Sequence, residues 1–169
     1  MEEKILLIIG HSRFDDDQYK LVRGILASQG FPTETASTHL SAAQGTYGLD
    51  VMPDVLINYV ESGDYRAFVF IGGEGASEYY SNSDVLRIIN QAHLTGKLLA
   101  AIGSAVPTLT YSGKLANALV SGDESDKTRL EELGAYYSPN PVTETGDFIT
   151  ANPTASQEFT EKIIEALSK

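Results

Sequence analysis

"GKLLAAIGSAVPTL" (residues 96–109) has the pattern of a buried strand that runs into a sharp turn and then a helix. Its apolar part, "LLAAI", is typical of a strand covered on both faces, because such strands show no alternation of polar and apolar residues. Pro107 suits the first turn of a helix, where its missing N–H is not needed. Between strand and helix comes a sharp turn, the place where many α/β enzymes carry a nucleophile. Here the turn holds Gly103 followed by Ser104, so the chemistry has either moved or been lost.

Buried strands and amphipathic helices alternate along the rest of the chain. "KILLIIG" (4–10) and "RAFVFIGG" (66–73) have the pattern of further buried strands. Apolar residues recur at helical spacing in three segments, which are residues 18–30, 83–95 and 153–169. This alternation predicts an α/β fold, a three-layer αβα sandwich with a mostly parallel, doubly wound (flavodoxin-like) sheet. No repeat or linker interrupts it, so we expect a single domain over residues 1–169.

The remaining segments predict shorter elements. "FPTETAS" (31–37) has the pattern of a strand, residues 38–50 that of a loop with short extended pieces, and "MPDVLINYVES" (52–62) that of a helix with Pro53 in its first turn. "NALVS" (117–121) predicts a strand, and "SDKTRLEELG" (125–134) a helix capped by Ser125. "PVTETGDFITA" (141–151) predicts a hairpin that turns at Thr145-Gly146-Asp147.

Composition excludes several classes of protein. The chain has no cysteine, which excludes disulfides, thiolate metal sites and a cysteine nucleophile. Its net charge of −11 argues against nucleic acid and anionic membranes as partners, because phosphates need clustered Lys and Arg. No apolar run approaches the roughly 18 residues of a membrane span. The acidic start "MEEKILLIIG" lacks the marks of a secretory signal, so we expect a cytoplasmic protein.

Three segments should converge at one crevice, because ligands of such folds sit at the carboxyl ends of the strands. These segments are "GHSRFDD" (10–16), "GGEGAS" (72–77) and "GSAVP" (103–107). Glycines such as Gly72 and Gly73 let backbone N–H groups approach a ligand closely, as an oxyanion or carboxylate site requires, although a tight turn needs them equally. Neither a dinucleotide fingerprint nor a phosphate loop is present, so we expect no cofactor.

Acids and histidines near this crevice have both structural and chemical interpretations. Asp15 and its two acidic successors can cap the following helix, while one of them could point into the crevice. His11 lies at the mouth of the first strand, where a general base could act. His39 and His93 fall on a loop and a helix, and no cluster at ligand spacing supports a metal site.

The chain resembles the ThiJ/PfpI (DJ-one) superfamily, of the class I glutamine-amidotransferase-like fold, over nearly its whole length. The resemblance rests on "KILLIIG", "FDDDQYKLVRGILASQGF", "YRAFVFIGGEGASEYY", "GKLLAAIGSAVPTL" and "GDFITANPTASQEFTEKIIEAL" in this order. It implies a glutamate near the start of the first helix, an elbow cysteine, and an anion site of backbone N–H groups. Counted without gaps, these positions fall on Asp15 and Gly103, with Ser104 next and Gly122 where a histidine or tyrosine is common.

The sequence departs from the family where the family's chemistry resides. Glyoxalase-like, deglycase-like and peptidase-like reactions use the cysteine, so the resemblance implies the scaffold and not the reaction. Glycine at an elbow relieves the backbone strain that a residue with Cβ would bear there. We therefore expect a non-catalytic protein that binds a small anionic or carbonyl metabolite, and, from the resemblance alone, a homodimer.

Two alternatives stay open. A slipped register would make Ser104 the nucleophile of a peptidase-like or amidase-like hydrolase, with His11 or Asp15 as its partner. The turn does not match G-x-S-x-G, however, because isoleucine and valine take the outer glycine positions. A purely structural or stress-related partner protein would leave the crevice without a ligand.

Overall fold

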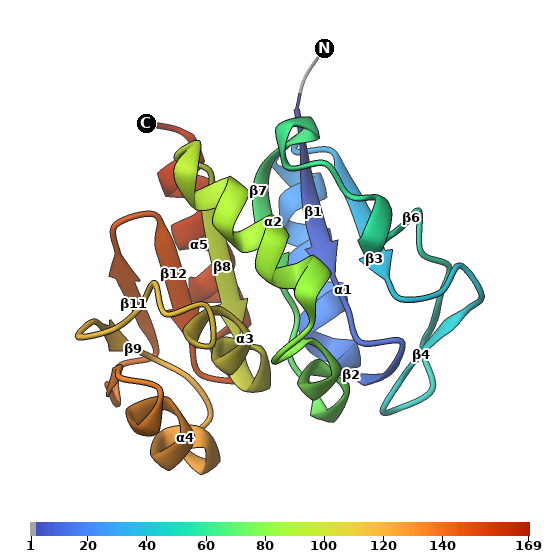
Figure 1. Cartoon of the computed structure of the whole chain (residues 1–169). Helices are drawn as coiled ribbons and strands as arrows, with labels where there is room; N and C mark the ends of the chain where they lie inside the picture. Colours follow the sequence, from blue (N-terminus) through green and yellow to red (C-terminus); the bar gives the residue numbers. More distant parts are fainter. Residues whose placement is uncertain (1–2) are drawn as a thin grey trace.

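A seven-stranded sheet lies at the centre of the molecule, and its strands follow the order β11-β12-β8-β7-β1-β3-β6 (Figure 1). The computed structural model describes residues 3–169. Every neighbouring pair in this sheet is parallel except β11 and β12, which form the predicted hairpin. The strands are β1 (Lys4–Ile8), β3 (Thr33–Ser37), β6 (Val55–Leu56), β7 (Tyr65–Phe70), β8 (Leu98–Ile102), β11 (Val142–Thr145) and β12 (Phe148–Ala151). The predicted mostly parallel sheet is confirmed.

Helices cover both faces of the sheet, which completes the predicted three-layer sandwich. α2 (Ser83–Leu94) and α3 (Val106–Thr110) lie in front of it in Figure 1, and α1 (Asp16–Ser28) and α5 (Ser156–Leu167) lie behind. Each face has its own core, because alternate residues of β1 point in opposite directions. Leu6 and Ile8 pack with the residues of α2 and α3, while Ile5 and Leu7 pack with those of α1 and α5. This double burial explains the uninterrupted apolar runs of the sequence.

A smaller lobe follows α3. It holds β9 (Leu119–Val120), the 3₁₀ turn η5 (Glu124–Asp126), α4 (Lys127–Glu132) and β10 (Tyr136–Tyr137), with β9 and β10 paired in parallel. The helix expected here begins two residues later than predicted. Ser125 is not its cap, because the Asp123 carboxylate accepts hydrogen bonds from Ser125 N–H and Oγ–H and so forms the η5 turn first.

The helix expected over residues 52–62 is wrong. The chain instead forms β6 and then a 3₁₀ turn, η1 (Ile57–Tyr59). β6 pairs with β3 at the edge of the sheet, and Asp54 fixes the register on both sides of Thr35. Its backbone N–H donates to Thr35 O and its carboxylate accepts from Thr35 N–H, each at 2.8 Å. Pairing with the free edge of the sheet thus determined the structure of this short segment, although its apolar residues have helical spacing.

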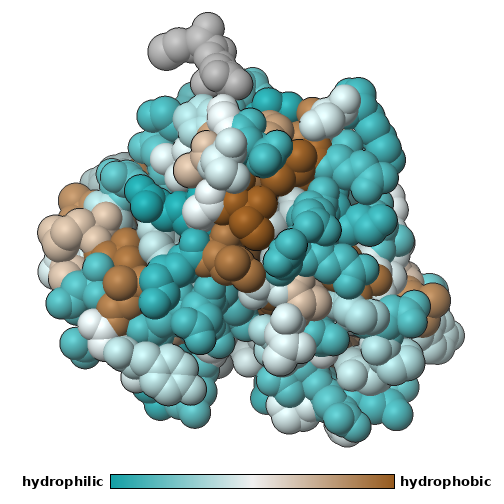
Figure 2. Space-filling view, turned by 180° about the vertical axis from the view of Figure 1, so that it is seen from behind, coloured by the Kyte–Doolittle hydropathy of each residue, from teal (hydrophilic) through white to brown (hydrophobic). Residues whose placement is uncertain are grey.

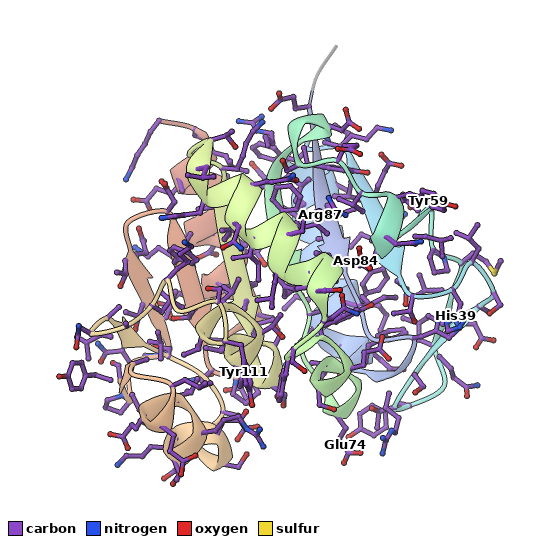
Figure 3. All side chains as sticks on the ribbon, in the orientation of Figure 1. His39, Tyr59, Glu74, Asp84, Arg87 and Tyr111 are labelled. Carbon is purple, nitrogen blue, oxygen red and sulfur yellow. The ribbon has the colours of Figure 1, made fainter. Side chains whose placement is uncertain are left out.

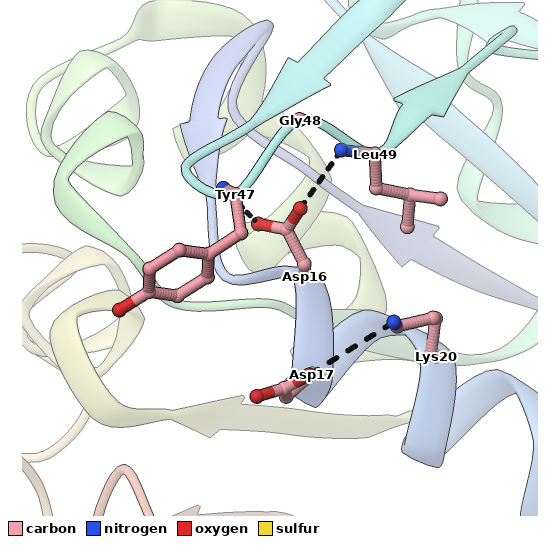
Figure 4. Close-up of a pocket in the computed structure, with 6 residues that line it drawn as sticks. All are labelled: Asp16, Asp17, Lys20, Tyr47, Gly48 and Leu49. Carbon is pink, nitrogen blue, oxygen red and sulfur yellow. Dashed lines mark hydrogen bonds and ion pairs between the residues drawn. The ribbon is translucent and has the colours of Figure 1, made fainter.

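A three-stranded sheet of β2 (Ser12–Phe14), β4 (Ala43–Gly45) and β5 (Asp50–Val51) covers the start of α1. The buried Asp16 carboxylate holds its loop, accepting hydrogen bonds from Tyr47 N–H at 3.0 Å and Leu49 N–H at 2.9 Å (Figure 4). A Cβ at Gly45 would collide with this carboxylate, so glycine is required there. One carboxylate therefore fastens residues 45–49 to the helix that leads into the candidate site.

The rear face, which carries α1 and α5, shows an apolar strip between polar regions (Figure 2). On α1, Leu21 is 42% exposed. Partly buried apolar residues packed against the core on this side include Phe31, Ile164, Ala166 and Leu167. No helix in residues 3–169 combines the length and apolarity needed to cross a bilayer.

Candidate functional site

The turn after β8 has the backbone conformation of an elbow, and Gly103 is the residue that bears it. Its φ is +59°, in the left-handed region, whereas Ser104 is not among the positive-φ residues of the described chain. A Cβ at Gly103 would lie 3.2 Å from Gln18 Nε2 and 3.2 Å from Pro153 Cβ. A side chain here would therefore be strained in its backbone and crowded by its neighbours.

Gln18 is the side chain that reaches the elbow. It is 2% exposed. Its Oε1 accepts a hydrogen bond from Gly72 N–H at 2.9 Å, and its Nε2 donates to Pro153 O at 3.0 Å. The amide therefore spans the space beside Gly103 between the end of β7 and the segment after β12. Only a neutral group that both donates and accepts can make these two bonds.

Asp15 does not reach Gln18's position beside the elbow. It is the N-cap of α1, and its carboxylate accepts a hydrogen bond from Gln18 N–H at 2.9 Å. Asp15 therefore caps the helix, as its structural interpretation predicted. The side chain beside the elbow belongs to Gln18, about one helical turn further along α1. A signal for Gln18 existed, because residues 18, 22 and 26 form the buried face of α1 and a glutamine there is polar among apolar residues.

Gly72 and Gly73 bring the other two segments to the elbow. A Cβ at Gly72 would lie 2.6 Å from Ile102 O and 3.1 Å from Ser104 N, and one at Gly73 would lie 2.6 Å from Arg13 O. Gly73 also has a φ of +107°. Both positions therefore require glycine, and the three predicted segments do converge. The Gly72 N–H is already bonded to Gln18, which leaves Gly73 and Ser104 as the neighbouring backbone groups.

His11 is bound elsewhere. Its Nδ1 lies 3.3 Å from Ser37 Oγ and its Nε2 lies 3.2 Å from Ser41 Oγ, so the ring nitrogens face the last residue of β3 and the segment after it. Its ring centroid is 4.8 Å from that of His39, which Figure 3 shows at the side of the molecule. Among the contacts of residues 3–169, none joins His11 to Ser104.

An aromatic cluster supports the other side of the elbow. Tyr80 O–H donates to Ser104 O at 2.7 Å. The Tyr80 ring stacks on Tyr111, with centroids 5.5 Å apart, and the Arg129 guanidinium carbon lies 5.2 Å from the Tyr80 ring centroid. Burial, with Asp126 as the next cause, raises the pKa of Tyr80 to about 12, so its hydroxyl remains a donor at neutral pH. The cluster fixes the Ser104 carbonyl.

Gly122 and His93, which the sequence analysis also singled out, both take part in packing. A Cβ at Gly122 would contact Leu130 and Val106, each at 3.4 Å, so this buried residue serves the packing of α3 and α4. His93 packs against the Phe148 ring, away from the elbow, with centroids 5.5 Å apart. Within residues 3–169 no group of three or more His, Asp and Glu residues could hold a metal ion.

These features define an α/β protein with an elbow at the carboxyl edge of a parallel sheet, carrying a glycine at the elbow and an amide beside it. The chain belongs to the DJ-1/PfpI family, whose model matches residues 3–166.

Relatives of the chain cover nearly its whole length. An uncharacterised protein of Methanocaldococcus jannaschii is 26% identical over 98% of this chain and 83% of its own length. Protein dj-1beta of Drosophila melanogaster is 24% identical over 98% of this chain and 90% of its own length. The crystal structure of a ThiJ/PfpI domain protein from Brachyspira murdochii has a TM-score of 0.94 at 25% identity, covering 99% of this chain and 98% of that one.

Proposed function

We propose that this chain is a non-catalytic member of the DJ-1/PfpI family that binds a small anionic or carbonyl metabolite beside its elbow without forming a covalent bond. The observation that carries the proposal is the pair formed by Gly103 and Gln18. Covalent attack needs a nucleophile, and the elbow residue has no side chain. Proton transfer needs a titratable group, and a carboxamide does not titrate at physiological pH.

The surroundings of Gly103 also leave little room for a nucleophilic side chain at the elbow. Gln18 and Pro153 crowd the space that a Cβ would enter at Gly103. Gln18 further bonds both to Gly72 N–H and to Pro153 O, so it cannot turn toward a substrate without giving up buried hydrogen bonds. Glyoxalase-like, deglycase-like and peptidase-like reactions of the family therefore have no counterpart in our proposal.

Binding would use the backbone groups that the glycines bring together. Gly73 N–H and Ser104 N–H are the candidate donors, and the hydroxyl of Ser104, a partly exposed residue, adds a third polar group. Such donors suit a carboxylate or a carbonyl oxygen. The net charge of −11 gives no long-range attraction for anions, so recognition would depend on these local donors.

An NMR titration tests this proposal. Acetate and pyruvate should shift the backbone amide signals of Gly73 and Ser104 most, and Gly73→Ala should weaken the effect, because its Cβ would collide with Arg13 O and Asp15 N, each at 2.6 Å, and so displace the Gly73 amide. Gly63→Ala is the matched control, since no atom of residues 3–169 lies within 4 Å of a Cβ there. Absence of shifts at both amides in the unmodified protein would overturn the proposal.

The alternative hydrolase would use Ser104, and one observation favours it. Ser104 is a partly exposed residue directly after the elbow. His11 would have to leave Ser37 and Ser41 to act as its base. Turnover of an ester or amide that disappears in Ser104→Ala would support this alternative.

We extend the proposal to a homodimer, which the resemblance to the family led us to expect. α1 offers a suitable surface. Leu21 is 42% exposed, and Gly24 lies in the middle of the helix, where no atom of the described residues comes within 4 Å of a Cβ position. A mid-helix glycine costs about 1 kcal/mol relative to alanine, and close approach of a second copy would account for it.

The cytoplasmic location expected from the sequence stays a prediction.

A further inference from the structure

A polar cavity of about 340 Å³ lies outside the elbow, between the end of α3 and the α4 lobe. It is lined by Tyr111, Ser125, Thr128, Arg129, Glu132 and Leu133. A cavity of this volume is at the lower end of the range for small-molecule sites. Two hydroxyls, a phenol and two opposite charges face it, so its chemistry differs from that of the elbow.

Arg129 is held in place, while most of its N–H donors have no hydrogen-bond partner within residues 3–169. Its guanidinium stacks over Tyr80, 5.2 Å from the ring centroid. Its remaining contacts are long, with Nη1 3.4 Å from the Tyr111 hydroxyl and Nε 3.8 Å from the Asp126 carboxylate. Charged hydrogen bonds to a carboxylate are usually about 2.7–2.9 Å. The guanidinium is thus pre-organised to bind a carboxylate, and within the described part of the chain its ion pair is the long one with Asp126.

Glu132 provides the opposite charge one turn further along α4. It lines the same cavity as Arg129. Among the ion pairs of residues 3–169, none includes Glu132, so the two charges do not neutralise each other directly. Opposite charges kept apart in one cavity suit a ligand that itself carries both signs.

The surroundings disfavour a simple anion. Asp126 lies beside Arg129, and the pKa of Asp126 is raised by burial and then by the charge of Asp123. A lone carboxylate ligand would be repelled by these acids and by Glu132. An ammonium group on the same ligand would offset this repulsion.

We propose that this cavity binds a free α-amino acid, with the ligand carboxylate on Arg129 and the ligand ammonium on Glu132. The Ser125 and Thr128 hydroxyls lie at the cavity wall and can bond to the remaining polar atoms. The site does not depend on ligand binding at the elbow. The cavity nevertheless adjoins the elbow, because Arg129 stacks on Tyr80 and the Tyr80 hydroxyl donates a hydrogen bond to Ser104 O.

An NMR titration of the full chain separates the possible ligands. Glycine is the minimal zwitterion, acetate supplies only the carboxylate and methylammonium only the cation. We expect glycine to shift the Arg129 Nε–Hε signal and the Thr128 amide, with an affinity about tenfold higher than that of either half-ligand. L-Leucine and L-serine then report whether Leu133 or the hydroxyls select the side chain.

Variants with matched controls complete the test. Arg129→Gln and Glu132→Gln should each weaken glycine binding about tenfold. Glu131→Gln, on the same helix but outside the cavity lining, and Arg23→Gln, on α1, should leave it unchanged. Equal binding of acetate and glycine, no shifts near α4, or equal losses in the control variants would each overturn the proposal. Shifts confined to Gly73 and Ser104 would do so too, while leaving elbow binding supported.

Discussion

The Gln18 amide nitrogen lies 3.2 Å from the point where a Cβ would stand at Gly103. The glutamine thus takes the place beside the elbow, donating to Pro153 O and accepting from Gly72 N–H. A protonated glutamic acid could make the same two bonds, but an ionised glutamate could not donate. Gln18 therefore reproduces the neutral form of an acid permanently, whatever the pH.

Gln18→Glu tests this relationship. Burial and the facing Pro153 carbonyl should raise the pKa of the introduced carboxyl above the value of about 4.3 in the unfolded chain. A raised folded-state pKa means that the variant is most stable below that unfolded value and loses stability as pH rises toward the folded-state pKa. Each unit by which the folded-state pKa exceeds the unfolded-state pKa should cost about 1.4 kcal/mol of stability at pH 8. Urea midpoints of variant and parent between pH 4 and 8 check this, and parallel curves would contradict it.

Asp16→Asn tests the fastening of residues 45–49. Burial by itself would raise the pKa of Asp16, but the N–H groups of Tyr47 and Leu49 bring it below its ordinary value. Its contribution to stability is therefore present above about pH 3.9 and lost as pH falls through the lowered pKa. Asparagine keeps one acceptor, so we expect a loss of about 1–3 kcal/mol and faster exchange of the Tyr47 and Leu49 amides.

The neighbouring acid supplies the control for this change. Asp17 has a side chain that is 86% exposed, and its Oδ1 lies 4.0 Å from Lys20 Nζ. Asp17→Asn should therefore change stability by less than about 1 kcal/mol and leave both loop amides protected. Similar exchange in the two variants would mean that Asp16 does not hold the loop.

Gly103→Cys tests the elbow itself. The new Cβ meets Gln18 and Pro153 in a left-handed conformation, so we expect a loss of about 1–2 kcal/mol. Ser104→Cys should cost less, because Ser104 has no positive φ. Denaturant midpoints and iodoacetamide rates of both variants are the measurement. A neutral, unreactive Gly103→Cys beside a destabilised, reactive Ser104→Cys would mean that Ser104 is the elbow residue.

The dimer proposal predicts a sedimentation mass of about twice that of the 18.2 kDa chain at tens of micromolar protein. Leu21→Lys should shift the protein toward monomer, because it places a charge on the exposed apolar surface of α1. Leu94→Lys is the control, since this leucine is 83% exposed on α2. A monomeric mass for the unmodified chain, or equal effects of the two variants, would refute the α1 interface.

Local patterns predicted most of this fold, because a strand buried on both faces must be apolar throughout. β1, β7 and β8 could be located for that reason. The structure of residues 52–62 could not be predicted in this way, since it depends on hydrogen bonds between Asp54 and Thr35 at the edge of the sheet. Gln18 was missed for a similar reason. A gapless count placed the family's acid at Asp15, and the bond from Gln18 to Pro153 joins residues 135 positions apart.

A turnover assay with methylglyoxal tests whether the elbow with Gly103 is non-catalytic. A chain without a thiol, with glycine at the elbow and an amide beside it, should give no consumption above the buffer background. The assay is run with the unmodified protein and Ser104→Ala, both checked for folding by thermal melting. Robust turnover by the unmodified protein would contradict the account. If that turnover survived Ser104→Ala the chemistry would lie elsewhere in the chain, and if it vanished Ser104 would be the nucleophile.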